Sequence, residues 1–389
     1  MNATDPTVEE SRVELEVPQQ LLRRSGFAAA APLFSADLAS AGSLDEAEQV
    51  VASHGRRLWS EAVRKDGAII DDRPLYWARL TLSARLHAWR PDFAVDDQDR
   101  AALLTRLEHA SRGHDDLVFP PGDRKLRVIV TGFDPFGLDT DIRASNPSGV
   151  AALSLHDATF EAADHTAVVR TALFPVRWRD LTHGMVERVL LPHYTADPGS
   201  SAAADAVITV SQGREGRFDL EAHNGAWRGG RADNEGRTAP GLIPLGAEAP
   251  RLDPQPQWSP SSLPRQAIVA HAAGRFPVYD NTEVTEIPAD AGAEGEPVRR
   301  PNGPTPASAA RAGAGGDYVS NEIAYRNTVL RDATGRSIPA GHVHTPVLRL
   351  GGTDPGALTD ADFERDRADI VEQLRAIITA AVRPAAPDE

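Results

Sequence analysis

The first part of the chain carries apolar residues at the spacing of amphipathic helices. Three segments between residues 44 and 113 follow this pattern, in which positions three and four apart share one helix face. The first segment follows Ser43 and opens with an acidic turn, as helix N-termini commonly do. We therefore expect residues 1–120 to form a helical N-terminal extension.

After residue 120 the pattern changes to short β-branched runs that alternate with helical segments. The runs lie at residues 126–133, 165–176, 205–213 and 342–350. The chain ends on one more amphipathic segment, 359–382, for which Thr359 and Asp362 resemble a capping pair. Strands that alternate with helices indicate an α/β domain with a largely parallel sheet, here spanning residues 121–389.

Residues 237–312 interrupt this alternation. The segment is rich in proline, glycine and alanine, which predicts long surface loops. A short helix is expected within it, at residues 266–276.

Composition and charge narrow the class of protein. The 389 residues are 41% hydrophobic and 25% charged, as in soluble globular proteins, and the formal net charge is −15. That acidity argues against nucleic acid or an anionic membrane surface as a partner, since both favour a basic face. No run of about 18 apolar residues is present. Residues 23–43 faintly resemble a secretory signal, but Pro32 breaks the apolar part, so we expect a cytoplasmic protein.

The absence of cysteine removes several kinds of chemistry. Disulfides, thiolate metal sites, iron–sulfur clusters and a cysteine nucleophile are all excluded.

Two stretches that follow predicted strands carry candidate binding residues. Phe133 and Phe136 lie in "TGFDPFG", where they would either wall a small apolar pocket or fill the core. Gln212 in "SQGREGR" offers an amide to a ligand. Glu221, in the extended piece that follows, is either a solvated charge or an acid of the site.

Two further stretches carry candidate catalytic residues. Ser320 stands where glycines lead into a helix; such a serine is most often a cap, but it can also be a nucleophile. His342 and His344 share a face of a predicted strand, as a general base or as hydrogen-bonded core residues. Together Glu221, His344 and Ser320 provide the acid, base and nucleophile of a triad. A zinc site built from these histidines, His223 and Glu221 is the metal alternative.

These four stretches together resemble the pyroglutamyl peptidase I family. "VIVTGFDPFG" followed by "NPS" is similar to that family's N-terminal signature, and "LEAHNGAWRGGRADNEG" to the segment with the catalytic glutamate. "GGDYVSNEIAY" is similar to the nucleophile segment, in which the family has cysteine. "GHVHTPVL" is similar to the segment with the catalytic histidine.

The resemblance implies a three-layer α/β/α sandwich with a mixed, mostly parallel sheet. It also implies hydrolytic removal of an N-terminal pyroglutamate, with no metal or other cofactor and with a peptide or small cyclic amide as substrate. By position the triad is Glu221, Ser320 and His344. The substrate-binding positions are Phe133, Phe136, Gln212 and Val319. The family arginine before the D-N pattern has no secure match, because Arg231 stands one residue away. The oligomeric state stays open, and a homo-oligomer is compatible with the sequence.

The chain departs from the family in three ways. The family segment "GQAGGR" appears here only as "SQGREGR". Residues 1–120 and 237–312 have no counterpart in its small bacterial members. Serine replaces the cysteine nucleophile, and a serine hydroxyl must lose its proton to the base as it attacks. The sequence therefore leaves two functions open: a serine-type hydrolase, or a binding protein that has lost catalysis.

Overall fold

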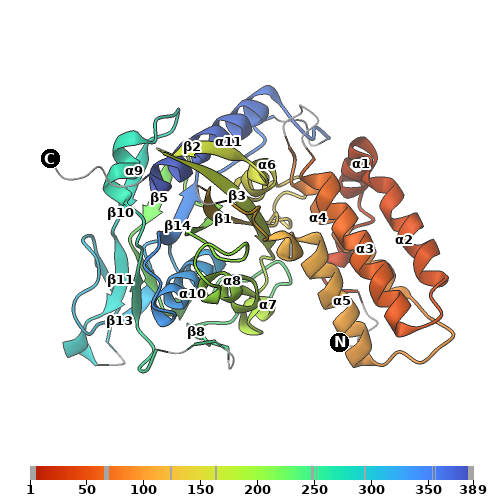
Figure 1. The fold of residues 1–389 in the computed structure, drawn as a ribbon, viewed down its shortest axis with the longest axis horizontal. Coiled ribbons are helices and arrows are strands. Elements are labelled where there is room, and N and C mark those ends of the chain that lie inside the picture. The colour runs from red at the N-terminus through yellow and green to blue at the C-terminus, as the bar shows by residue number, and fades with distance from the viewer. Residues whose placement is uncertain are drawn as a thin grey trace.

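A mixed seven-stranded sheet forms the centre of the molecule (Figure 1). The computed structural model describes residues 6–64, 70–122, 125–162, 164–246, 249–250, 252–292, 295–352, 354 and 356–383. The strands, in spatial order, are β10 (Val278–Asn281), β5 (Phe218–Glu221), β14 (Ala340–Thr345), β4 (Ala206–Gln212), β1 (Lys125–Phe133), β3 (His165–Phe174) and β2 (Thr159–Ala162). All pairs are parallel except β5 with β14 and β2 with β3. The four strands predicted from β-branched runs are confirmed.

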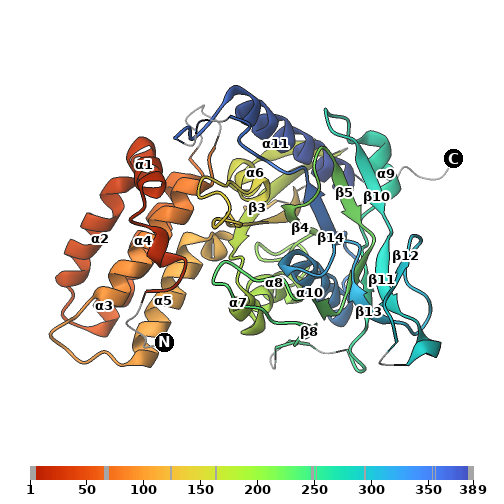
Figure 2. The same cartoon turned by 180° about the vertical axis from the view of Figure 1, so that it is seen from behind.

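Helices cover both faces of this sheet, as Figures 1 and 2 show. One face packs against α6 (Pro147–Leu155), α9 (Arg265–His271) and α11 (Ala361–Val382). The other packs against α7 (Trp178–Thr182), α8 (Met185–Thr195) and α10 (Val319–Ala333). The predicted three-layer α/β/α sandwich is confirmed. The capping pair predicted for α11 is wrong, because Asp360 is its N-cap and accepts the Phe363 N–H.

The N-terminal region is helical and stands at one side of the sandwich (Figure 1). Its helices are η1 (Glu10–Arg12), α1 (Glu16–Ser25), η2 (Phe27–Ala29), α2 (Ala30–Ala39), α3 (Leu44–Ala62), α4 (Arg73–Ala88), α5 (Asp97–Ser111) and η3 (His114–Asp116). Ser43 caps α3 as expected, accepting the Glu46 N–H. These helices enclose an apolar core of their own, which continues onto α6 through Leu153. None of the described helices has both the length and the hydropathy to cross a membrane.

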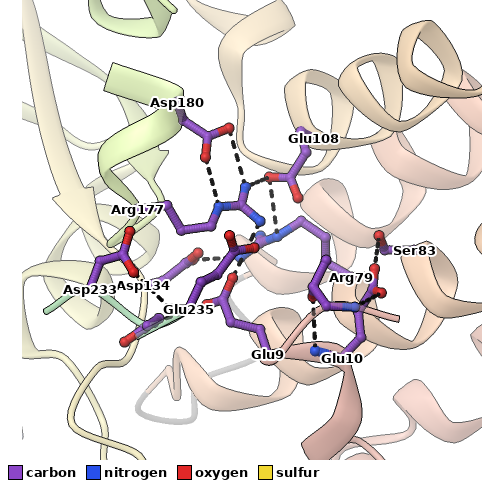
Figure 3. Close-up of polar contacts among 12 residues, drawn as sticks. Glu9, Glu10, Arg79, Ser83, Glu108, Asp134, Arg177, Asp180, Asp233 and Glu235 are labelled. Carbon is purple, nitrogen blue, oxygen red and sulfur yellow. Dashed lines mark hydrogen bonds and ion pairs between the residues drawn. The ribbon is translucent and has the colours of Figure 1, made fainter. Parts of the chain in front are cut away.

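Buried charges join the helical region to the sandwich (Figure 3). Arg177, just before α7, lies 3.3 Å from Glu9 and 3.1 Å from Glu108 of α5. Asp134, which follows β1, lies 2.5 Å from Arg79 of α4. All of these side chains are buried or nearly so, and breaking a buried pair leaves an uncompensated charge. The ion pairs therefore fix how the two parts dock.

Residues 237–312 contain more regular structure than predicted, because the two stretches expected as long loops carry short strands between their loops. The helix expected at 266–276 is present as α9, but shorter. The segment also contributes β10 to the main sheet. A separate antiparallel sheet has the order β12 (Val298–Arg300), β11 (Val284–Ile287), β13 (Ala309–Ala312). The remaining short elements are β6 (His223–Gly225), β7 (Trp227–Arg228), β8 (Gly241–Leu242), β9 (Trp258–Pro260) and η4 (Ala289–Ala291).

Candidate active site

Strand pairing brings the predicted acid and base into contact. β5 runs antiparallel to β14, with Glu221 opposite His342 and Asp219 opposite His344. Glu221 Oε1 lies 2.6 Å from His344 Nδ1, and both side chains are buried. A carboxylate oxygen accepts hydrogen bonds, so the contact assigns the N–H donor to His344 Nδ1 and leaves Nε2 as the ring nitrogen that does not contact Glu221. This is the arrangement of an acid that orients a general base.

His342 has a structural role. Its Nδ1 lies 2.8 Å from Thr209 Oγ1, and its Nε2 lies 2.7 Å from Ser211 Oγ. Complete burial, together with the neighbouring His344 ring at 4.6 Å, holds the pKa of His342 well below its ordinary value. The ring is therefore neutral and fully hydrogen-bonded, and it supports the His344 ring from one side.

Ser320 lies in the first turn of α10. The N-cap position is Tyr318, which makes no side-chain cap, and Ser320 is the second helical residue. The interpretation of Ser320 as the cap of this helix is therefore wrong. Asn321 anchors the helix start to β6, accepting the Gly225 N–H at 3.0 Å and donating to the Gly225 carbonyl at 2.8 Å.

The predicted site residues line one cavity. It has a volume of about 300 Å³ and opens beyond the ends of β1, β4 and β5. Its lining includes all seven predicted positions: Phe133, Phe136, Gln212, Glu221, Val319, Ser320 and His344. Residues from five separate segments of the chain thus line the same cavity.

Aromatic rings and a cation form one side of this cavity. Phe133 is buried against Phe174, whereas Phe136 is half-buried and faces Tyr318 at a ring distance of 6.5 Å. The Arg231 guanidinium lies 5.4 Å from the Phe136 ring and 4.7 Å from the Tyr318 ring. Cation–π attraction holds this arginine over both rings. The sequence had left Arg231 unassigned and had given Tyr318 no role.

Two acidic residues that the sequence analysis did not select also line the cavity. Asp219 lies 3.1 Å from Arg217 and 3.7 Å from Arg214. Burial raises the pKa of Asp317, which stands three residues before the serine. Asp219 precedes a quoted segment and Asp317 lies within "GGDYVSNEIAY", but neither is one of the candidate positions, so only their place in the fold reveals them.

Two glycines pack directly against the base. A Cβ atom at Gly315 would lie 2.8 Å from His344 Cε1, and one at Gly213 would lie 2.5 Å from His344 Cβ. Such separations are far below van der Waals contact, so both positions need glycine. The imidazole is enclosed by backbone on these sides, which restricts its rotation.

The zinc alternative requires several ligands to converge. Among the residues that the structure describes, no group of three histidine, aspartate or glutamate side chains is arranged to hold a metal ion.

Family models match most of the chain. Residues 1–108 match a model described as the PA0049 N-terminal domain, and residues 127–250 and 268–349 match the PA0049 C-terminal domain. The chain belongs to the PA0049 family. A curated family member from Pseudomonas aeruginosa PAO1, the uncharacterized protein PA0049, is 32% identical; the alignment covers 92% of this chain and 83% of that protein.

Two of the solved structures that resemble part of this chain are peptidases. Pyrrolidone carboxyl peptidase from Pyrococcus furiosus is 20% identical, with a TM-score of 0.41, and the match covers 66% of this chain and 98% of that one. Pyroglutamyl peptidase I from Bacillus amyloliquefaciens is 21% identical, with a TM-score of 0.41, over 67% and 97% of the two chains. The function of this chain is therefore inferred from its own pocket residues.

Proposed function

We propose that this protein is an amide hydrolase that removes an N-terminal pyroglutamyl, or a similar cyclic-amide, residue from a peptide through Ser320, His344 and Glu221. The observation that carries the proposal is the 2.6 Å contact between Glu221 Oε1 and His344 Nδ1 beside a cavity that Ser320 also lines. The motif resemblance supports the pyroglutamyl substrate class.

In the proposed reaction His344 acts first as a base and then as an acid. Its Nε2 takes the hydroxyl proton as Ser320 Oγ attacks the substrate carbonyl. The proton then passes to the departing amine, and an acyl-serine remains. Water, deprotonated by the same imidazole, attacks this ester; the imidazolium then returns the proton to Ser320 Oγ as the acid leaves. Glu221 stabilises the imidazolium at each stage.

The start of α10 supplies the groups that would stabilise the oxyanion. The first three N–H groups of a helix have no partner within it, and the macrodipole there favours negative charge. The Glu322 N–H is the first to bond inside the helix, to the Tyr318 carbonyl at 3.2 Å. The N–H groups of residues 319–321 are therefore available for the charge that develops next to Ser320.

The shape of the cavity agrees with a small ring as substrate. A volume of about 300 Å³ is at the lower end for ligand sites. Phe133, Phe136 and Val319 offer apolar walls. Gln212 Oε1 accepts the Leu348 N–H at 3.4 Å, which directs the amide NH₂ group to a ligand oxygen.

One observation favours a second candidate, a non-catalytic binding protein. Within the described part of the chain, no hydrogen bond joins Ser320 Oγ to the His344 ring. The hydrolase requires this contact to form when substrate binds, as catalytic hydrogen bonds often do, whereas the binding protein does not require it.

The test is hydrolysis of a pyroglutamyl chromogenic amide by the wild type, Ser320→Ala and Ser320→Cys. Ser60→Ala is the matched control, because this exposed serine of α3 donates to the Arg57 carbonyl of its own helix, its one side-chain hydrogen bond among the described residues. We expect turnover by the wild type and the control, and a loss of at least about 10³-fold in Ser320→Ala. A fluorophosphonate should label Ser320 in the wild type, and iodoacetamide should have no effect.

Two other outcomes would contradict the proposed mechanism. Equal rates for the wild type and Ser320→Ala would exclude this serine as the nucleophile. Turnover by Ser320→Cys alone, with ligand binding retained in the wild type, would establish the binding protein.

A further inference from the structure

Segment 237–312 reaches the catalytic acid. Its strand β10 is the edge strand of the main sheet and pairs in parallel with β5, with Asn281 opposite Glu221. The Asn281 backbone carbonyl accepts the Ala222 N–H at 2.9 Å, which ties the end of this edge strand to the main sheet. A residue far from every motif is thereby placed beside the site.

The Asn281 amide makes two hydrogen bonds with its nitrogen. Nδ2 donates to Glu221 Oε2 at 2.8 Å and to the Ala314 carbonyl at 2.8 Å. Both partners are acceptors, so the amide has one satisfactory orientation, with NH₂ toward them. The two N–H groups of one side chain therefore bind the acid and the glycine loop at the same time.

These bonds act on both partners of His344. The two carboxylate oxygens of Glu221 are divided: Oε1 bonds to His344 Nδ1 and Oε2 to Asn281. Both oxygens of the carboxylate are thus held by hydrogen bonds, which fixes the orientation of its plane. Ala314 immediately precedes Gly315, which packs against the edge of the imidazole. Movement of Asn281 would free the carboxylate and the loop together.

We propose that Asn281 is a positioning residue of the triad, supplied by segment 237–312. Its donated hydrogen bond holds the Glu221 carboxylate in place and keeps Oε1 aligned with Nδ1. The imidazole then keeps its lone pair on Nε2, where the Ser320 proton must go. The predicted effect of Asn281 on the rate rests on the proposed function. Its predicted effect on the His344 Nδ1 proton does not, because that proton can be observed without turnover.

The kinetic test compares Asn281→Ala and Asn281→Asp with the wild type. Loss of a hydrogen bond to a charged group predicts a fall in kcat of about 10- to 100-fold, with KM within about threefold. Asn281→Asp is isosteric but replaces the donors with acceptors and places a second carboxylate against Glu221. Its kcat should be lower still at pH 8. It should recover relative to Asn281→Ala as the pH falls to 6, because a shared proton restores one donor.

Tyr279→Ala is the matched control on the same strand. Tyr279 is exposed and stacks on Arg217 at 4.9 Å. Its removal should leave kcat, KM and the pH profile unchanged. A melting curve for each variant identifies any that fails to fold, in which case the isosteric Asn281→Asp decides the kinetic test.

A proton NMR measurement separates this proposal from the proposed function. The Nδ1 proton bound to Glu221 should give a downfield resonance, assigned by its absence in His344→Gln. We expect it to broaden or move in Asn281→Ala and to persist in Tyr279→Ala. An Asn281-dependent resonance in a wild type without turnover would refute the hydrolase and retain the positioning role. An unchanged resonance and unchanged kcat in a folded Asn281→Ala would refute the positioning role.

Discussion

Replacing Glu9 tests how the helical region is attached to the sandwich. Glu9 is buried between the two parts (Figure 3). Its Oε1 accepts the Tyr76 hydroxyl at 2.9 Å and the Asn234 amide at 2.9 Å, and its Oε2 lies 3.3 Å from Arg177 Nη1. Asn234 in turn donates to the Pro135 carbonyl, in the loop that carries Phe136. One carboxylate thus connects α4 to two loops of the sandwich.

The magnitude follows from these bonds. Glu9→Ala leaves two buried donors, the Tyr76 hydroxyl and the Asn234 amide, without this acceptor. Each unsatisfied donor costs about 1–3 kcal/mol of stability. Part of that loss is offset because the buried carboxylate itself is unfavourable, as the raised pKa of Glu9 indicates. We expect Glu9→Ala to lower the free energy of unfolding by about 2–4 kcal/mol.

Glu9→Gln separates the hydrogen bonds from the ion pair. Glutamine keeps an oxygen at the Oε1 position for both donors. Arg177 retains Glu108 at 3.1 Å and Asp180 at 2.8 Å, so its charge is not left alone. The expected loss is below about 1.5 kcal/mol.

Equilibrium unfolding in urea, followed by tryptophan fluorescence, measures both variants. Glu14→Ala is the control, because the Glu14 side chain is 73% exposed and lies 4.0 Å from Arg85, so its removal should change stability by no more than about 0.5 kcal/mol. Equal destabilisation by Glu9→Gln and Glu9→Ala would refute the hydrogen-bond argument and assign the docking energy to the ion pair.

Two further substitutions test the surroundings of the site. Burial, and then the Asp71 carboxylate, raise the pKa of Asp72 from 3.8 to about 7. The contribution of protonated Asp72 to the free energy of unfolding is complete below about pH 4. It is lost as the pH rises through about 7. Asp72→Asn should therefore flatten the fall in melting temperature between pH 5 and 8, and parallel curves would contradict this. Gly213→Ala places a Cβ 2.5 Å from His344 Cβ; we expect at least a tenfold loss of kcat, whereas Gly230→Ala, with open space around it, should match the wild type.

The main sheet could be predicted because its strands are locally distinct. β1, β3 and β4 are β-branched runs that are largely buried, and such runs stand out from the helical segments around them. The sheet in segment 237–312 could not be predicted in this way. Its strands are short and not uniformly apolar, and a buried carboxylate, Glu286, holds them through Arg300 and Thr305. Strands held by polar contacts leave no hydrophobic pattern to detect.

The site was predictable only in part. Residue chemistry suggested Glu221, Ser320 and His344, and the motif resemblance joined them into one group. Their proximity depends on the antiparallel register of β5 and β14, which no local pattern specifies. Asn281 was missed because it is separated from its partner Glu221 by 60 residues and lies in an edge strand of a segment that was predicted to be loop.

The segments outside the motif resemblance also contact residues of the site. From the helical region, Glu9 bonds to Asn234, and Asp72 accepts the Asn146 N–H at 2.8 Å. Asn146 itself lines the cavity. From segment 237–312, Asn281 donates to Glu221 at 2.8 Å. A serine nucleophile depends on close alignment with its base, because it has no stable ionised form to compensate for misplacement. For the proposed serine hydrolase, the extension and the insertion therefore supply rigidity where the mechanism most needs it.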